Sequence, residues 1–68
     1  MMRYTYEISR RSASVGGGWL LRLLDNGEEV GGGVFPPING LRLDLALAAA
    51  RDDAETEAEA WLSSRPQS

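Results

Sequence analysis

The stretch GGGWLLRLLDNGEEVGGGVFP, residues 16–36, decides the fold. Asn26-Gly27 stands between two apolar runs and is the preferred pair for a two-residue type I′ hairpin, because both turn residues must adopt positive φ. The turn predicts antiparallel strands on either side and a register in which residue 23 faces residue 30. That register gives a core face of five apolar side chains: Trp19, Leu21, Leu23, Val30 and Val34. A shift of the strand register by one residue would turn all of these side chains toward solvent.

The residues before this stretch predict another strand. Residues 3–12 alternate between β-favouring apolar side chains and polar ones, with Tyr4, Tyr6 and Ile8 on one face. A glycine-rich loop at residues 12–18 then leads into the hairpin.

A second glycine triplet, Gly31–Gly33, lies inside the third predicted strand. Glycine within a strand often marks a bulge or the close approach of a bulky group, and we expect that group to be Trp19 or Trp61. Pro36-Pro37 ends the strand, because proline has no amide hydrogen for the ladder.

Residues 43–63 predict one long helix. Alanine is frequent there, and apolar residues recur at helical spacing. Asp44 is placed to cap the helix if the helix begins at residue 45. The expected apolar positions are Leu43, Leu47, Ala50, Ala54, Ala58, Trp61 and Leu62.

Together these elements predict one α+β domain over residues 1–63, with a frayed tail at residues 64–68. The domain is a three-stranded antiparallel β-meander followed by one long C-terminal helix packed on one face (β-β-β-α). At 68 residues and without cysteine, it must be held by good packing or by a second copy of the chain.

The composition predicts a protein that is not an enzyme and needs no cofactor or metal. The chain has no histidine, cysteine or lysine, so it lacks the usual base for a serine nucleophile, the usual zinc ligands and the phosphate-loop lysine. No apolar run approaches the ~20 residues of a membrane span, and the N-terminus lacks a secretory apolar region. We expect a cytoplasmic protein.

The sheet face away from the helix stays partly apolar in this prediction, which favours a protein-interaction or regulatory module. The partner is another protein or a second copy, giving a homodimer. The expected contact residues are Leu20, Leu24 and Phe35.

The alternative is a nucleic-acid-binding accessory protein. Its phosphate contacts would be Arg3, Arg10, Arg11 and Arg22. A net charge of −3 makes nucleic acid the less favoured partner, because phosphate binding depends on neutralising charge.

Two resemblances add to this interpretation. YTYEISRR (4–11), residues 16–36 and AEAWLSSR (58–65) resemble a group of short uncharacterised bacterial proteins. That resemblance implies a three-stranded sheet with one helix and no functional residues. Gly17-Gly18-Trp19 and Trp61-Leu62 are more loosely similar to HicB-like antitoxins, which implies an antitoxin function. The longer strand arrangement and DNA-binding tail of that family have no counterpart here.

Overall fold

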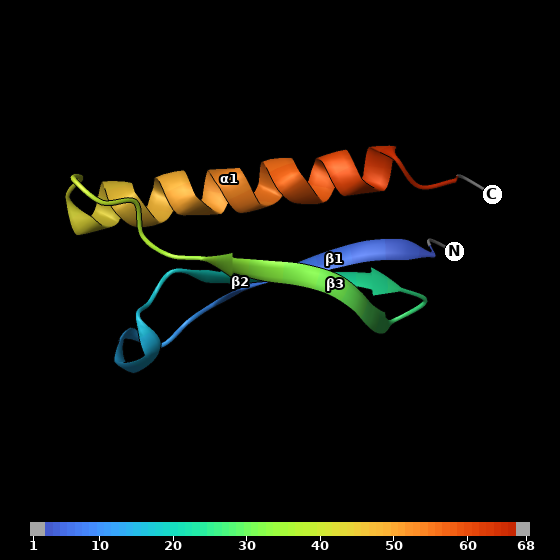
Figure 1. The fold of residues 1–68 in the computed structure, drawn as a ribbon, viewed down its shortest axis with the longest axis horizontal. Coiled ribbons are helices and arrows are strands. Elements are labelled where there is room, and N and C mark those ends of the chain that lie inside the picture. The colour runs from blue at the N-terminus through green and yellow to red at the C-terminus, as the bar shows by residue number, and fades with distance from the viewer. Residues whose placement is uncertain (1–2, 67–68) are drawn as a thin grey trace.

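A computed structural model describes residues 3–66, and in it three antiparallel strands precede one helix (Figure 1). The strands lie in the order β1-β2-β3, and the helix covers one face of the sheet, so the predicted β-β-β-α fold is confirmed. The elements are β1 (Tyr4–Arg10), the 3₁₀ helix η1 (Ala13–Val15), β2 (Trp19–Asp25), β3 (Glu28–Phe35) and α1 (Leu43–Ser63). Residues 67–68 of the tail that we expected to fray lie outside the described residues.

The hairpin turn has the predicted geometry. Asn26 and Gly27 adopt φ values of 56° and 84°, as a type I′ turn requires. The first pair beyond the turn is Asp25 with Glu28, and Leu24 faces Glu29, as the predicted register requires.

Beyond this pair the predicted register is wrong, because β3 contains a bulge. Leu23 pairs with Gly31 instead of Val30. One extra residue in a strand turns every later side chain to the other face. Val30 and Val34 are therefore about half exposed, at 53 % and 50 %, instead of lying in the core. Phe35 now pairs with Trp19 and packs against the core.

Gly32 explains why glycine is needed next to this irregularity. Its φ is 141°, and a Cβ atom at this position would collide with the carbonyl group of Leu21 on β2. The expected close approach at the second triplet is therefore present, but the approaching group at Gly32 is the backbone of β2 and not the side chain of Trp19 or Trp61.

The core lies between β2 and a row of alanines on α1. Leu21 and Leu23 point toward the helix, where Tyr6, Ile8, Phe35 and Trp61 pack around them and Ala58. Four alanines at intervals of four residues are at most 2 % exposed, and a helix brings such positions onto one face. They are Ala46, Ala50, Ala54 and Ala58. Ala46 was absent from the predicted face, whereas Leu43, which was included, is exposed.

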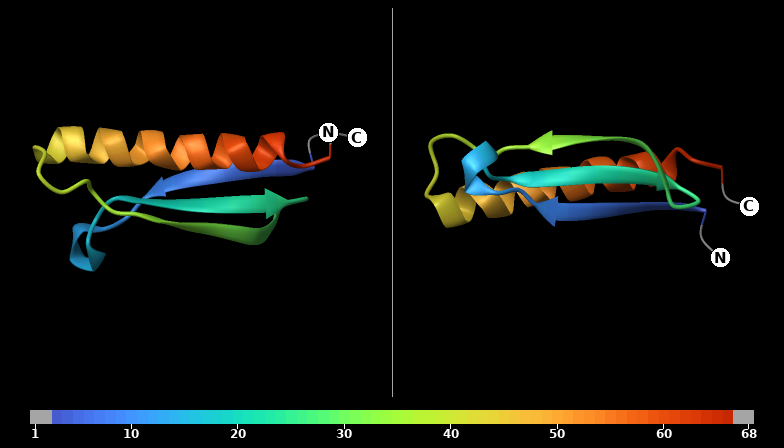
Figure 2. Two further views of the ribbon diagram at one scale, coloured as in Figure 1. Left: turned by 45° about the horizontal axis from the view of Figure 1, so that its top comes forward. Right: turned by 90° about the horizontal axis from the view of Figure 1, so that it is seen from below.

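The helix is longer than the strands beneath it. At 21 residues α1 is about 31 Å long, whereas strands of seven or eight residues reach about 23–26 Å. The first turn of α1 consequently extends past the sheet, above the loop that holds η1 (Figures 1 and 2). Arg42 is the N-cap residue, and Asp44 lies inside the first turn, where its Oδ1 accepts a hydrogen bond from the amide of Leu45.

Candidate functional site

The three side chains predicted to contact a partner do not share one surface. Leu20 lies on the sheet face away from the helix, opposite Val34, and is half-buried. Leu24 is buried, at 7 % exposure. Phe35 packs against the core on the helix side, because the bulge in β3 reverses its direction.

Two of the four predicted nucleic-acid contacts are paired with carboxylates. Arg22 lies between Glu29 at 2.8 Å and Glu7 at 3.3 Å on the sheet face away from the helix. The hydrogen bond to Glu29, with the charges of both carboxylates, raises the pKa of Arg22. Arg3 is 2.7 Å from Asp25, and their hydrogen bond lowers the pKa of the Asp25 carboxyl. These pairs neutralise much of the local positive charge.

The other two arginines lie at the far end of β1. Arg11 donates hydrogen bonds to the carbonyls of Gly17 and Val15, at 2.9 Å and 2.8 Å, and so holds the loop between β1 and β2. Arg10 lies over the Trp19 ring at 5.9 Å, and no carboxylate of residues 3–66 is within ion-pair distance of it. Arg3 and Arg10 stand about 23 Å apart along the strand. The four arginines therefore do not form one basic patch.

The largest exposed apolar side chains gather where β3 leads into α1. We call this surface the apolar end and define it by Ile38, Leu41, Leu43 and Leu45, which are 40–67 % exposed. The overhang of α1 accounts for it, since the first turn has no strand beneath it (Figure 1). Sequence reasoning missed this surface. Its signal is the spacing of the leucines at 41, 43 and 45. Residues two apart in a helix point to different sides, so Leu43 and Leu45 cannot both face the sheet, and a partner that covers both must wrap around the end of the helix.

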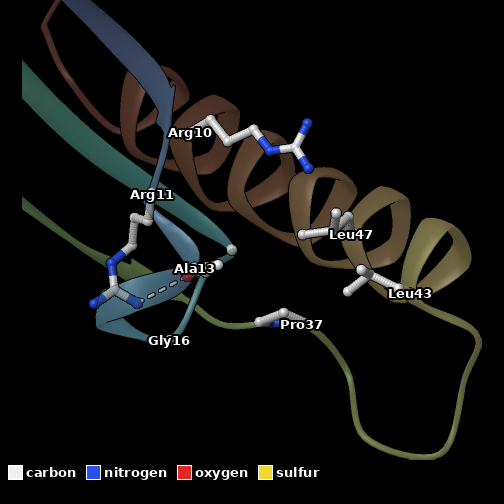
Figure 3. A pocket seen from close by; sticks show the side chains of 9 residues that line it. Arg10, Arg11, Ala13, Gly16, Pro37, Leu43 and Leu47 are labelled. Atoms are coloured by element: carbon white, nitrogen blue, oxygen red, sulfur yellow. Dashed lines mark hydrogen bonds between the residues drawn. The ribbon is translucent and has the colours of Figure 1, made fainter.

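A small cleft lies beside the apolar end, between the first turns of α1 and the glycine loop (Figure 3). Its volume is about 180 Å³. Leu43 and Leu47 form the helix side, Pro37 lies between helix and loop, and Gly16–Gly18 form the loop side. The guanidinium of Arg10 extends toward Leu47, whereas that of Arg11 turns to the loop carbonyls.

Trp19 fixes the helix to the sheet beside this cleft. Its Nε1 donates a hydrogen bond of 2.8 Å to the carbonyl of Leu47 in α1. The guanidinium of Arg51 lies over the same ring at 4.8 Å. Gly18 is buried next to Trp19, and a Cβ atom there would be 2.7 Å from Cα of Pro36. Trp19 therefore ties the helix that lines one side of the cleft to the strand that follows the loop on the other side.

The chemistry that this arrangement offers is binding. Two arginines line the cleft together with apolar side chains; Arg11 is bonded to loop carbonyls, whereas Arg10 has no such bond among the described residues. Within residues 3–66, no three acidic side chains gather as they would around a metal ion. In the same part of the chain, no helix has both the length and the apolar character that a bilayer crossing requires.

The predicted resemblances to short bacterial proteins and to HicB-like antitoxins remain predictions. Comparison of the chain with protein-family models, curated proteins and solved structures gives no match.

Proposed function

We propose that this protein is a protein-interaction module without catalytic activity, and that the apolar end is its contact surface. The observation that supports the proposal is the distribution of large aliphatic side chains in residues 3–66. Seven of them are 40 % exposed or more, whereas the buried ones are Leu21, Leu23 and Leu24. Four of the seven belong to the apolar end. Grouped exposure of this kind is typical of a surface that is covered by a partner.

Burying the four side chains of the apolar end would supply only part of the binding free energy that a specific complex needs. Fully burying one large aliphatic side chain contributes about 1.5–3 kcal/mol, and these four side chains are roughly half exposed. Covering them would contribute about 3–6 kcal/mol in total. A specific complex buries about 800 Å² on each partner and must also offset the entropy lost on association. A partner must therefore extend beyond the four side chains.

The test is affinity capture from a lysate of the source organism with three baits. The first is the parent, and the second carries Leu43→Ser and Leu45→Ser. The third carries Ala48→Ser, an exposed position of the same helix, as the matched control. We expect one protein to be retained by the parent and by the control and lost with the double variant. Because both leucines are exposed, all three baits should show the same circular dichroism spectrum.

The same baits decide whether the partner is a second copy of the chain. Sedimentation equilibrium of the purified parent should then show a dimer that the double variant dissociates. A partner retained equally by all three baits, or a parent that stays monomeric and captures no protein, would refute the apolar end as the contact surface.

A further inference from the structure

We propose that the cleft beside the apolar end binds the C-terminal residue of a partner chain, an aliphatic residue with its free carboxylate. This inference rests on the proposed function and names the group that the module recognises. In this arrangement the aliphatic side chain lies between Leu43, Leu47 and Pro37, and the carboxylate meets the guanidinium of Arg10 (Figure 3).

The size of the cleft limits the ligand to about one residue. Its volume of about 180 Å³ is close to that of a cavity of ~150 Å³ that holds a single benzene molecule. Ligand sites for larger molecules are typically ~300–1,000 Å³. The cleft is therefore too small for a nucleotide and large enough for one aliphatic side chain with the adjacent carboxylate.

The charge of the cleft favours an anion, and Arg10 is the group available to receive it. Arg11 is already engaged by the carbonyls of Gly17 and Val15. The amides of Gly16 and Gly17 donate to carbonyls of the same loop, at 3.1 Å and 3.0 Å. The guanidinium of Arg10 is therefore the charged group available to hold the anion, and the engaged amides of Gly16 and Gly17 disfavour a loop cradle for a phosphate group.

The C-terminal residue of a chain can contact both the apolar side chains of the cleft and the guanidinium of Arg10. Its carboxylate and aliphatic side chain branch from the same Cα atom, so an anion and an apolar group lie a few ångströms apart. An internal aspartate or glutamate carries the charge without a separate apolar group. Guanidinium–carboxylate hydrogen bonds are among the stronger polar contacts, and capture of a terminal carboxylate is a recurring mode of peptide recognition.

The experiment is a titration of the full chain, followed by ¹⁵N–¹H correlation spectra, with an acetylated Ala-Ala-Leu tripeptide. The matched ligand is the same tripeptide with a C-terminal amide. We expect saturable shifts of the amides of Gly16–Gly18 and of the Trp19 indole, with a dissociation constant on the order of millimolar for so small a ligand. The amide should bind about tenfold more weakly or worse, because it loses the charge-assisted bonds.

Two variants assign the contact to this cleft. Arg10→Gln should weaken binding of the free acid to the level of the amide. Arg42→Gln is the control, since Arg42 belongs to the same end of the molecule but is paired with Asp44 and does not line the cleft. Equal affinity for the acid and the amide, or the absence of saturable shifts, would overturn the proposal.

Free 4-methylpentanoate tests the source of the ligand. Binding as tight as that of the tripeptide would overturn the assignment to a chain terminus and point to a small free acid. The outcome is also separable from the proposed function. If Leu43→Ser with Leu45→Ser loses a captured partner while no peptide binds, the interaction surface stands and the cleft assignment fails.

Discussion

Ala54→Leu tests whether the row of alanines on α1 allows the helix to pack close to the sheet. Ala54 is 0 % exposed and belongs to the row with Ala46, Ala50 and Ala58. Leucine replaces its methyl group with an isobutyl group that has no space to enter. Overpacking of a filled core costs about 1–3 kcal/mol, whereas leucine and alanine differ by only about 0.2 kcal/mol in helix propensity.

The expected loss is large for a chain of this size. A domain of 68 residues has a free energy of unfolding of roughly 3–10 kcal/mol. A cost of about 2 kcal/mol should lower the melting temperature by about 8–16 °C. The assay is thermal unfolding followed by far-ultraviolet circular dichroism. Ala60→Leu is the control, because Ala60 is exposed on the same helix. If the two variants melt within about 2 °C of each other, the alanine row does not set the helix–sheet distance.

Three further predictions concern Gly18, the Trp61 ring and the ion pair of Asp25 with Arg3. Gly18→Ala should lower the free energy of unfolding, measured in urea, by more than Gly27→Ala does. Their φ values are 83° and 84°, but only the new Cβ of Gly18 would meet backbone atoms, so equal losses would contradict the close approach. Trp61→Ala should lower the free energy of unfolding by about 2–3 kcal/mol, because the ring is half-buried against the core. An unchanged melting temperature would show that the ring does not pack against the core. The hydrogen bond from Arg3 lowers the pKa of the Asp25 carboxyl from its ordinary value, so the charged form stabilises the fold at pH values above that ordinary value. In urea unfolding, the parent should be more stable than Asp25→Asn near neutral pH, and this difference should vanish as the pH falls through the lowered pKa. A difference that grows in acid would contradict a stabilising ion pair between Arg3 and Asp25.

The elements that could be predicted from the sequence are those set by near neighbours. Asn26-Gly27 needs positive φ at both residues, which determines the turn and the first pairs beyond it. The long C-terminal helix follows from a single run of helix-forming residues, whereas its first residue stayed open because residues 41–45 also alternate in the manner of a strand.

The register of β3 could not be derived in the same way, because it depends on contacts across the sheet. The turn alone pairs Val30 with Leu23, whereas the bulge places Gly31 there and brings Gly32 against the carbonyl of Leu21. The close approach at Gly32 is visible only once both strands are placed.

The candidate site was missed for a related reason. The apolar end exists because α1 outreaches the sheet, which is a difference between two lengths and not a property of either segment. The cleft, in turn, combines Arg10 from the end of β1 with Leu43 and Leu47 from α1. No local pattern brings these residues together.

The sheet face away from the helix is the rival contact surface, and its electrostatics weigh against it. Arg22, Glu7 and Glu29 occupy the middle of that face as two ion pairs that share Arg22. A partner that covered them would have to desolvate three charges, and the attraction between the charges rarely offsets the whole desolvation free energy. Interface centres are correspondingly depleted in charged residues. The apolar end has its ion pair, Arg42 with Asp44, in a widely exposed position, so a partner can cover the leucines and leave those charges in water. For this reason Leu20→Glu on the sheet face should leave partner capture unchanged, whereas the loss of the leucines at 43 and 45 should abolish it.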